Sequence, residues 1–297
     1  GIRDSSVTGV QTCDLPISPL TRAQVFRSDV RVVNIYVTVR DRKGELVRSL
    51  TREDFEVRED GRKQDLRYFS ADSDAPLTLG LLFDLSGSQR SIVEQQRAAS
   101  LTFLKQVMRE GDSAFFVAFD RNVRVFEASP LADLQPGFAN STGTALFDAV
   151  IVACDRVRDE PGRKTLVILS DGVDTASTAT MNDAITAAHR ANVSIFPIRF
   201  YDREVFRFNV PSPAMDNLRA GQKVLDKMAR DTGGALYEIT DNRTLADNFA
   251  RMQRELRSQY SLGYSPGEGK SGYRKLKVGV KRKGLLVQAR DGYFTLQ

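Results

Sequence analysis

Histidine, cysteine and long apolar stretches are scarce in this sequence. Of the 297 residues one is histidine, His189, and two are cysteine, Cys13 and Cys154. No apolar run approaches the roughly 18 residues that a membrane-spanning helix needs, so we expect no bilayer span. The single histidine stands in a predicted helix and no nucleophile-elbow motif is present, which argues against a Ser-His-Asp hydrolase. A Walker-type phosphate-binding loop is absent as well.

The overall composition is that of an ordinary globular protein. Hydrophobic residues make up 41% of the chain and charged residues 27%, and the length allows one large domain or two small ones. The formal net charge is +5. Because acidic and basic residues are mixed along most of the chain, this mild positive excess gives little support to a nucleic-acid partner, and we predict none.

The first 18 residues differ in character from the rest. The stretch "SSVTGVQTCDLPI" resembles the translation of a common sequencing-adapter oligonucleotide, so we predict that residues 1–18 are a non-native leader and exclude them from the fold prediction. A genuine disordered N-terminus is the alternative. Without Cys13, Cys154 has no partner for an intrachain disulfide. A signal peptide, if the gene encodes one, is expected upstream of Gly1.

Both ends of the remaining chain have the alternating pattern of β-strands. In "VRVVNIYVTVR" every second residue from Val33 to Val39 is apolar, which predicts a half-buried strand. Further strands are predicted in "FEVRE", and near the C-terminus in "QYSLGYSP", "YRKLKVGVKR" and "GLLVQARDGYFTL". We assign residues 19–75 and 258–297 to these two β segments. Each alone is too small to close a core, so we predict that they pair as a β-sandwich.

The middle of the chain, residues 76–257, has the pattern of an α/β domain. Short and nearly continuous apolar runs such as "LTLGLLFDLS", "SAFFVAFD", "TLVILSDG" and "VSIFPIRF" alternate with long helical patterns. Strands that are apolar on both faces and alternate with helices are typical of a mostly parallel sheet covered on both sides. We therefore predict a doubly wound, Rossmann-like sheet inserted between the two β segments.

Two of the predicted core strands end at an aspartate. Asp84 ends the first strand of the sheet, and Asp171 follows a later one. Ligands bind beyond the carboxyl ends of such strands, and with the usual order 3-2-1-4-5-6 these two strands are neighbours where the order reverses. Both carboxylates then face one crevice, where they repel each other unless a cation or protons intervene.

Hydroxyl groups accompany these acids. Ser86 and Ser88 follow Asp84, and we expect a third hydroxyl from Thr144 in "NSTGTALFDAV", on a glycine-containing loop that opens into a helix. With Asp171 the set holds two carboxylates and three hydroxyls, without histidine or cysteine. Such oxygen ligands suit a hard cation, and Mg²⁺ fits best, with Mn²⁺ or Ca²⁺ as alternatives.

The same residues resemble the metal-ion-dependent adhesion site of von Willebrand factor type A (VWA) domains. That site combines Asp-x-Ser-x-Ser, here Asp84 to Ser88, with a distant Thr, here Thr144, and a distant Asp, here Asp171 in "SDGVDT". Each piece occurs by chance, but all three in this order on an α/β background are specific. The flanks "VTVRDRKGELVRSLTREDFEVREDGRKQ" and "YSLGYSPGEGKSGYRKLKVGVKRKG" resemble a bacterial, often exported branch of VWA-related proteins, so the resemblance covers residues 27–297.

The resemblance implies a role for each ligand of the site. It implies that the three hydroxyls contact the metal directly and that the two aspartates bind it directly or through water. Neutral hydroxyls leave the dication under-neutralised, so that a carboxylate from a partner protein completes its coordination. One position departs from the family pattern: Gln89 stands where methionine commonly follows the second serine, a position that supplies no ligand.

We therefore predict a non-enzymatic binding module that uses Mg²⁺ above the sheet to adhere to an acidic group of a partner protein. The first alternative is a metal-dependent hydrolase or phosphatase that uses the same crevice. A haloacid-dehalogenase-type phosphatase also has Asp at the end of its first strand, but it needs a second Asp where Ser86 stands. The second alternative is a structural domain whose site engages no partner. From the resemblance alone we expect an extracytoplasmic location, periplasmic or secreted.

Several residues outside this set have simpler interpretations. We expect His189 on the surface of its helix and Cys154 in the core. Asp174 is expected to cap the turn that follows it. Asp148 is expected either to orient the threonine one helical turn before it or to lie on a solvated helix face.

The basic hairpin "RKLKVGVKRKG" also has two interpretations. It either contacts an acidic surface or forms a solvated strand face that is protected against edge pairing, and we favour the second.

Overall fold

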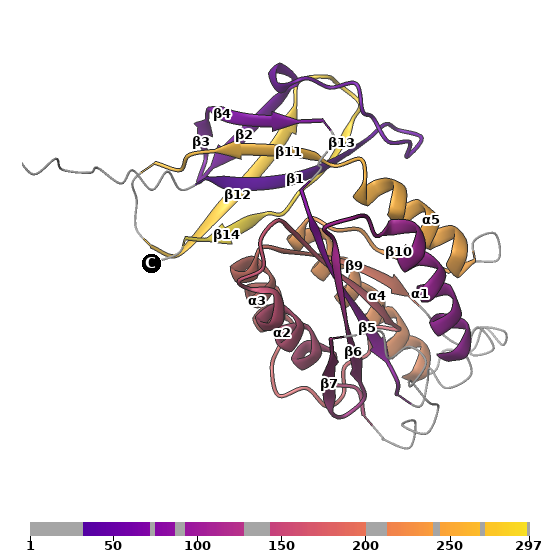
Figure 1. Ribbon diagram of the computed structural model, residues 1–297. Coiled ribbons are helices and arrows are strands. Elements are labelled where there is room, and N and C mark those ends of the chain that lie inside the picture. Colours follow the sequence, from indigo (N-terminus) through magenta and orange to yellow (C-terminus); the bar gives the residue numbers. More distant parts are fainter. Residues whose placement is uncertain are drawn as a thin grey trace, which may run out of the picture. The chain divides into compact units, whose positions relative to one another are not determined.

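A six-stranded sheet with helices on both faces and two four-stranded antiparallel sheets make up the described chain (Figure 1). This computed structural model describes residues 32–71, 75–86, 93–127, 143–199, 213–239, 244–267 and 271–295. The strands are β1 (Val33–Arg40), β2 (Phe55–Glu59), β3 (Arg62–Gln64), β4 (Leu66–Ser70), β5 (Leu77–Asp84), β6 (Ser113–Phe119), β7 (Val123–Phe126), β8 (Arg163–Ser170), β9 (Val193–Arg199), β10 (Tyr237–Glu238), β11 (Tyr260–Tyr264), β12 (Tyr273–Val280), β13 (Leu286–Gln288) and β14 (Gly292–Phe294). The helices are α1 (Val93–Val107), α2 (Leu146–Val157), α3 (Met181–Ala191), α4 (Pro213–Thr232) and α5 (Leu245–Leu256), with a short 3-10 helix η1 (Arg52–Asp54).

The six-stranded sheet has the strand order β10-β9-β8-β5-β6-β7. Counted along the α/β part of the chain from β7, this is the order 3-2-1-4-5-6, and it reverses between β5 and β8. β5, β6, β8, β9 and β10 run parallel, and β7 pairs antiparallel with β6 at one edge. The predicted doubly wound, mostly parallel sheet is therefore confirmed.

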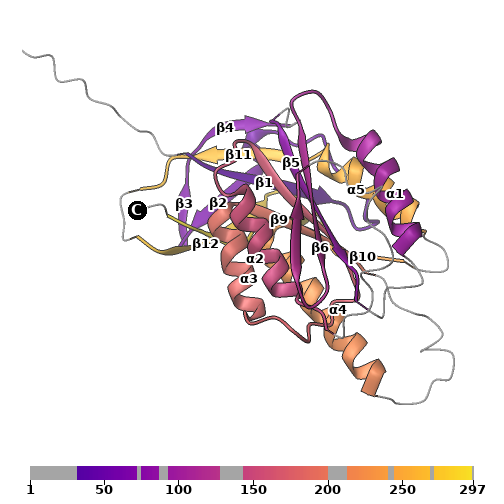
Figure 2. The ribbon, with the colours of Figure 1, turned by 60° about the horizontal axis from the view of Figure 1, so that its bottom comes forward.

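Helices cover both faces of this sheet because its central strands are apolar on both sides. Every residue of β5 and of β8 is buried. Leu81 of β5 belongs to the core under α1 and α5, where the rings of Phe103 and Phe249 stack at 4.4 Å. The next residue, Leu82, belongs to the core under α2, α3 and α4, which also contains Cys154, as predicted. Figure 2 shows the two groups of helices on the two sides of the strands.

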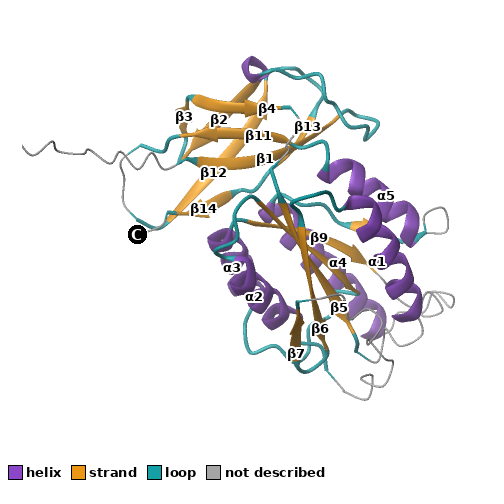
Figure 3. Cartoon of the chain, viewed as in Figure 1, coloured by secondary structure: helices purple, strands orange, loops and turns teal. Residues whose placement is uncertain are grey.

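The two β segments pair with each other, as predicted, and form the two antiparallel sheets. Their orders are β13-β1-β11-β4 and β14-β12-β2-β3, so each sheet mixes strands from the N-terminal and the C-terminal segment. Ile35 lies opposite Leu262 in the first sheet and Val57 opposite Val278 in the second. Residues of both sheets share one apolar core. Figure 3 shows this sandwich as strands, with η1 as its short helical turn.

The predicted domain boundaries at 75/76 and 257/258 stay a prediction. The predicted leader, residues 1–18, lies outside the described residues. Within the described ranges, none of the helices is both long and apolar enough to cross a membrane.

A buried carboxylate joins the sandwich to the α/β part. Glu255 of α5 is fully buried and accepts hydrogen bonds from the Tyr237 hydroxyl of β10 and from the Arg40 guanidinium of β1. Gln288 Nε2 of β13 donates to its second oxygen at 2.7 Å. Four elements from both parts of the chain thus meet at one charge, and each of its oxygens has a donor.

The prediction that His189 lies on a helix surface is wrong. His189 is only 6% exposed, and its Nε2 lies 2.9 Å from the carbonyl oxygen of Asp231 and 3.2 Å from Asp291 Oδ1. Its ring also packs against that of Tyr273 of β12, with the ring centres 5.5 Å apart. The helical pattern of the sequence carried no sign that strands from the C-terminal segment cover this end of α3.

We expect Glu255→Ala to lower the free energy of unfolding by about 3 kcal/mol, since it leaves the Arg40 charge and two further donors without their buried partner. Urea denaturation measures the loss. Asp155→Ala is the matched control, because Asp155 is 53% exposed in its ion pair with Arg158 and such pairs contribute about 0–1 kcal/mol. Equal losses in the two variants would contradict the role assigned to Glu255.

Candidate functional site

Asp84 ends β5 at the carboxyl edge of the sheet, where it is fully buried. The Ser86 backbone N–H donates to Asp84 Oδ1 at 3.0 Å, which turns the chain back over the strand end. The Ser170 hydroxyl, at the end of the neighbouring strand β8, donates to Asp84 Oδ2 at 2.6 Å. The two central strands are thus linked through this carboxylate. The sequence prediction missed Ser170, although a serine that ends a core strand directly before Asp171 was a usable signal.

Asp171 follows β8 directly and lies next to Asp84 at the same sheet edge. Parallel pairing brings the two strand ends together, with Phe83 opposite Leu169. Asp171 Oδ1 accepts the Val173 backbone N–H at 3.0 Å. The residue between them, Gly172, has φ +84°, and a Cβ there would meet the Gly221 carbonyl oxygen of α4 at 2.4 Å. Only glycine fits at this point, so the close approach of α4 fixes the course of the chain after Asp171.

Thr144 lies in the loop before α2 and is buried. The Ala145 N–H donates to the carbonyl oxygen of Asp120, just after β6, at 2.7 Å. On the other side, the Thr144 carbonyl oxygen accepts the N–H groups of Thr175 and Ala176, after β8, at 3.0 Å each. Because β6 and β8 flank β5 on its two sides, this loop crosses the carboxyl end of β5, where Asp84 lies.

Side chains from the loop after β8 also hold the start of α2. Asp174 Oδ1 accepts the Leu146 N–H at 2.8 Å, and the Ser177 hydroxyl accepts the Phe147 N–H at 3.0 Å. Asp174 therefore caps α2 across space. It also accepts the Ser177 hydroxyl at 2.5 Å in the turn that follows it, which is the turn that the sequence predicted it to cap. Asp148 of α2 accepts the N–H groups of Thr178 and Ala179 at 2.9 and 3.0 Å, so it holds the same loop in return. Neither of its predicted roles, orienting Thr144 or facing solvent, describes this arrangement.

Of the five residues predicted to bind metal, the structure places Asp84, Ser86, Thr144 and Asp171 at the carboxyl edge of β5, β8 and the loop before α2. All four are buried, with exposed fractions of 7% or less. Ser88 lies outside the described residues.

Burial dominates the electrostatics of Asp84. It raises the pKa of this carboxyl to about 7, the nearby Asp171 carboxylate adds to the rise, and hydrogen bonds from Ser170 and Ser86 oppose it. Two acids therefore share a poorly solvated edge, and their mutual repulsion disfavours the state in which both are ionised. A cation between them would remove that penalty.

The donor set fits a hard divalent cation. The candidate ligands offer carboxylate and hydroxyl oxygens, which Mg²⁺ prefers to nitrogen or sulfur. Within the described ranges there is no group of three or more His, Cys, Asp or Glu side chains that could hold a metal ion. The candidate site is of a different kind, because half of its described ligands are hydroxyls.

Comparisons with known proteins find similarity in structure. No family model and no curated protein sequence matches the chain. Among solved structures, the conserved hypothetical protein BatB from Bacteroides thetaiotaomicron is similar, with 16% identity and a TM-score of 0.45 over 61% of this chain and 97% of that one. A von Willebrand factor type A protein from Catenulispora acidiphila has 12% identity and a TM-score of 0.42 over 90% of this chain and 75% of that one. The PilB minor pilin from Streptococcus sanguinis has 12% identity and a TM-score of 0.45 over 63% and 62%.

The fold of the α/β part is VWA-like. Its own features carry this statement: the strand order 3-2-1-4-5-6, the antiparallel edge strand β7 and the helices on both faces. The resemblance to VWA domains that the sequence motif indicates is in this sense confirmed.

We expect Asp174→Ala to lower the free energy of unfolding by about 1 kcal/mol, because the first N–H groups of α2 lose their acceptor. Urea denaturation with the exposed α2 variant Asp155→Ala as control measures the difference. A loss no larger than that of the control would show that Asp174 does not cap α2.

Proposed function

We propose that the chain is a protein-binding module that holds a divalent cation, preferably Mg²⁺, at the carboxyl edge of its central sheet. The proposed ligands are the carboxylates and hydroxyls predicted from the sequence: Asp84, Ser86, Ser88, Thr144 and Asp171. The observation that carries the proposal is the burial of Asp84 beside a second carboxylate, with Ser86 and the Thr144 loop at the same strand end.

The cation would supply an open coordination position for an acidic group of the partner. The chain's own contribution is to fix the oxygens. Ser170 orients Asp84, the backbone turn at Ser86 brings that residue back over the strand, and Thr175 and Ala176 hold the Thr144 loop. Hydroxyl ligands add no negative charge, so the two aspartates at most balance the dication, and an open coordination position remains for a carboxylate of the partner.

We propose a binding module rather than an enzyme because modules of this fold generally serve protein interactions. The sequence also departs from the enzyme alternative, since a phosphatase of the haloacid-dehalogenase type needs a second aspartate where Ser86 stands. The adhesion role and an extracytoplasmic location are part of the proposal and rest on the resemblance to the exported VWA-related branch.

Mg²⁺ at roughly a hundred times its dissociation constant is expected to stabilise the protein by about 2.7 kcal/mol, because only the folded state brings the ligands together. This corresponds to a rise in Tm of several degrees, which differential scanning fluorimetry measures. Asp84→Asn is expected to abolish the shift, and Asp155→Asn, an exposed aspartate on α2, is expected to retain it. If the wild-type protein shows no shift with Mg²⁺, Mn²⁺ or Ca²⁺, or if Asp84→Asn keeps it, the metal site is excluded.

Partner binding is expected to depend on the same site. The immobilised protein is incubated in Mg²⁺ with an extract of the cells that encode it, and bound proteins are released with a chelator. Each released protein is then purified and tested for binding on its own. A true partner binds the wild type and Asp155→Asn in Mg²⁺, and it binds neither Asp84→Asn nor the chelated wild type. Partners whose binding is changed neither by the chelator nor by Asp84→Asn contradict the proposal. Turnover of a generic phosphatase substrate that requires Asp84 supports the enzyme alternative.

A further inference from the structure

The outer face of the sheet β14-β12-β2-β3 carries a dense group of cations. Exposure alternates along β12: Leu276 points into the sandwich core, while Lys275 and Lys277 on either side of it are exposed. Arg58 of β2 and Lys63 of β3 are exposed as well. These four cations come from three neighbouring strands, which Figure 1 shows in the sandwich.

The strand register places three of these cations in one row. Lys277 lies directly opposite Arg58, and Arg58 lies directly opposite Lys63. Neighbouring strands are about 4.8 Å apart, and directly opposite residues project from the same face of a sheet. Like charges in this position are destabilising. The fold alone gives no reason for such a row, and a ligand of opposite charge would neutralise it.

Acidic groups offset little of this charge. Glu56 Oε1 accepts a hydrogen bond from Arg58 Nε at 2.7 Å. That bond is the main cause that lowers the pKa of Glu56, and Lys63 and Lys281 lower it further, which shows that a fifth cation lies near the same carboxylate. Asp60 stands at the turn between β2 and β3 and accepts the Lys275 backbone N–H at 2.9 Å. Three of the five cations, Arg58, Lys63 and Lys281, therefore surround one surface carboxylate, and a second carboxylate lies at the margin of the face.

We propose that this face, defined by Lys275, Lys277, Arg58, Lys63 and Lys281, binds the surface of an anionic phospholipid membrane. The cations are spread in two dimensions, along β12 and across three strands. This arrangement matches a plane of headgroup phosphates better than the single line of phosphates along a nucleic-acid backbone. Four of the five are lysines, whose compact ammonium groups act as point charges and do not need the fixed geometry of a single phosphate.

The test is cosedimentation of the full chain with vesicles of equal parts phosphatidylglycerol and phosphatidylcholine, with pure phosphatidylcholine vesicles as reference. A chelator is present throughout, so the result does not depend on the proposed metal site. The wild type is expected to bind the anionic vesicles and not the neutral ones, and to dissociate at high salt. Each cation near an anionic surface contributes a factor of about five in binding. Lys277→Gln should therefore weaken binding about fivefold and the double variant Lys275→Gln/Lys277→Gln about 25-fold.

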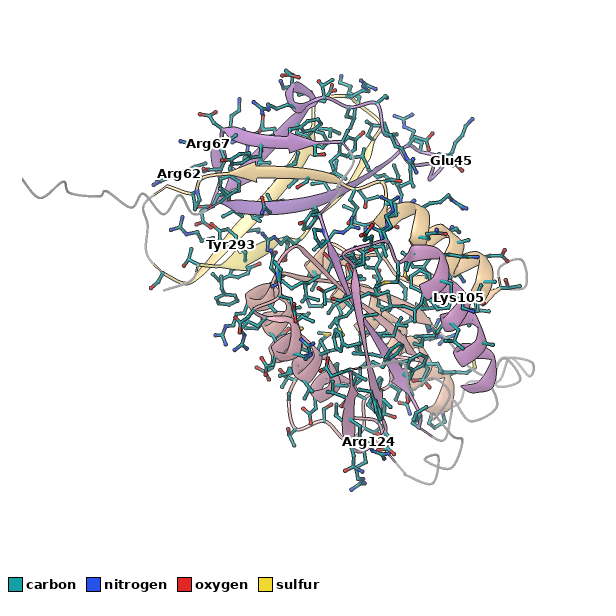
Figure 4. The ribbon with its side chains drawn as sticks, in the orientation of Figure 1. Glu45, Arg62, Arg67, Lys105, Arg124 and Tyr293 are labelled. Atoms are coloured by element: carbon teal, nitrogen blue, oxygen red, sulfur yellow. The ribbon has the colours of Figure 1, made fainter. Side chains whose placement is uncertain are left out.

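Lys105→Gln is the matched control. Lys105 is exposed on α1 (Figure 4), so this variant loses the same charge as Lys277→Gln without changing the sandwich face. It is expected to bind vesicles as the wild type does. Because Lys277 stands among like charges, its variant is expected to melt no lower than the wild type, which separates weaker binding from misfolding.

Three results would overturn the proposal. The first is equal binding to anionic and neutral vesicles, and the second is a loss in Lys277→Gln no larger than in Lys105→Gln. The third is a competition in which duplex DNA binds more tightly than the vesicles and displaces them. If the lysine variants also weaken DNA binding as they weaken vesicle binding, the face is a nucleic-acid surface. The Mg²⁺ titration of the Tm is a separate measurement, so either proposal can fail while the other stands.

Discussion

The burial of one carboxylate at the end of a core strand constrains the rest of the site. Asp84 is enclosed between two strands and has no exposed surface, so its charge is costly unless the surroundings compensate for it. Hydrogen bonds from Ser170 and Ser86 compensate in part, but the nearby Asp171 carboxylate acts in the opposite direction. An apolar residue would pack at this position without any such cost. The fold therefore keeps an ionisable group here that folding alone does not require, and a cation would stabilise its charged form.

The surrounding loops are built to hold this edge in one arrangement. The loop after β8 and the start of α2 exchange hydrogen bonds in both directions, through Asp174 on one side and Asp148 on the other. α4 adds a steric constraint, because the backbone at Gly172 and that at Gly221 approach so closely that neither position has room for a side chain. Pre-organisation of this kind lowers the entropic cost of bringing several weak oxygen ligands to one ion.

Sequence patterns predicted the sheet and the β segments because those elements bury regular faces. Alternating valines on β1 and continuous apolar runs in β5 and β8 follow directly from packing on one side or on both sides. The spacing of Asp84, Ser86, Thr144 and Asp171 indicated a common edge because each residue stands at a strand end or a helix start. Long-range polar contacts leave no such pattern. Glu255, Ser170 and the buried His189 acquire their partners only through tertiary packing, and Asp174 caps a helix that lies before it in the chain.

The sandwich and the candidate metal site lie at opposite ends of the same strand, β8. At its first residue, β8 reaches the sandwich: the Arg163 guanidinium lies 5.8 Å above the ring of Tyr36 of β1 and donates to Gln259, next to β11. At its last residue, β8 reaches the candidate metal site through the bond from Ser170 to Asp84. A parallel strand of this length spans about 25 Å. If the sandwich holds the module on an anionic surface, the strands separate that anchor from the carboxyl edge of the sheet. Glu255, which ties α5 to β1 and β13, adds a second, buried connection between the sandwich and the α/β part.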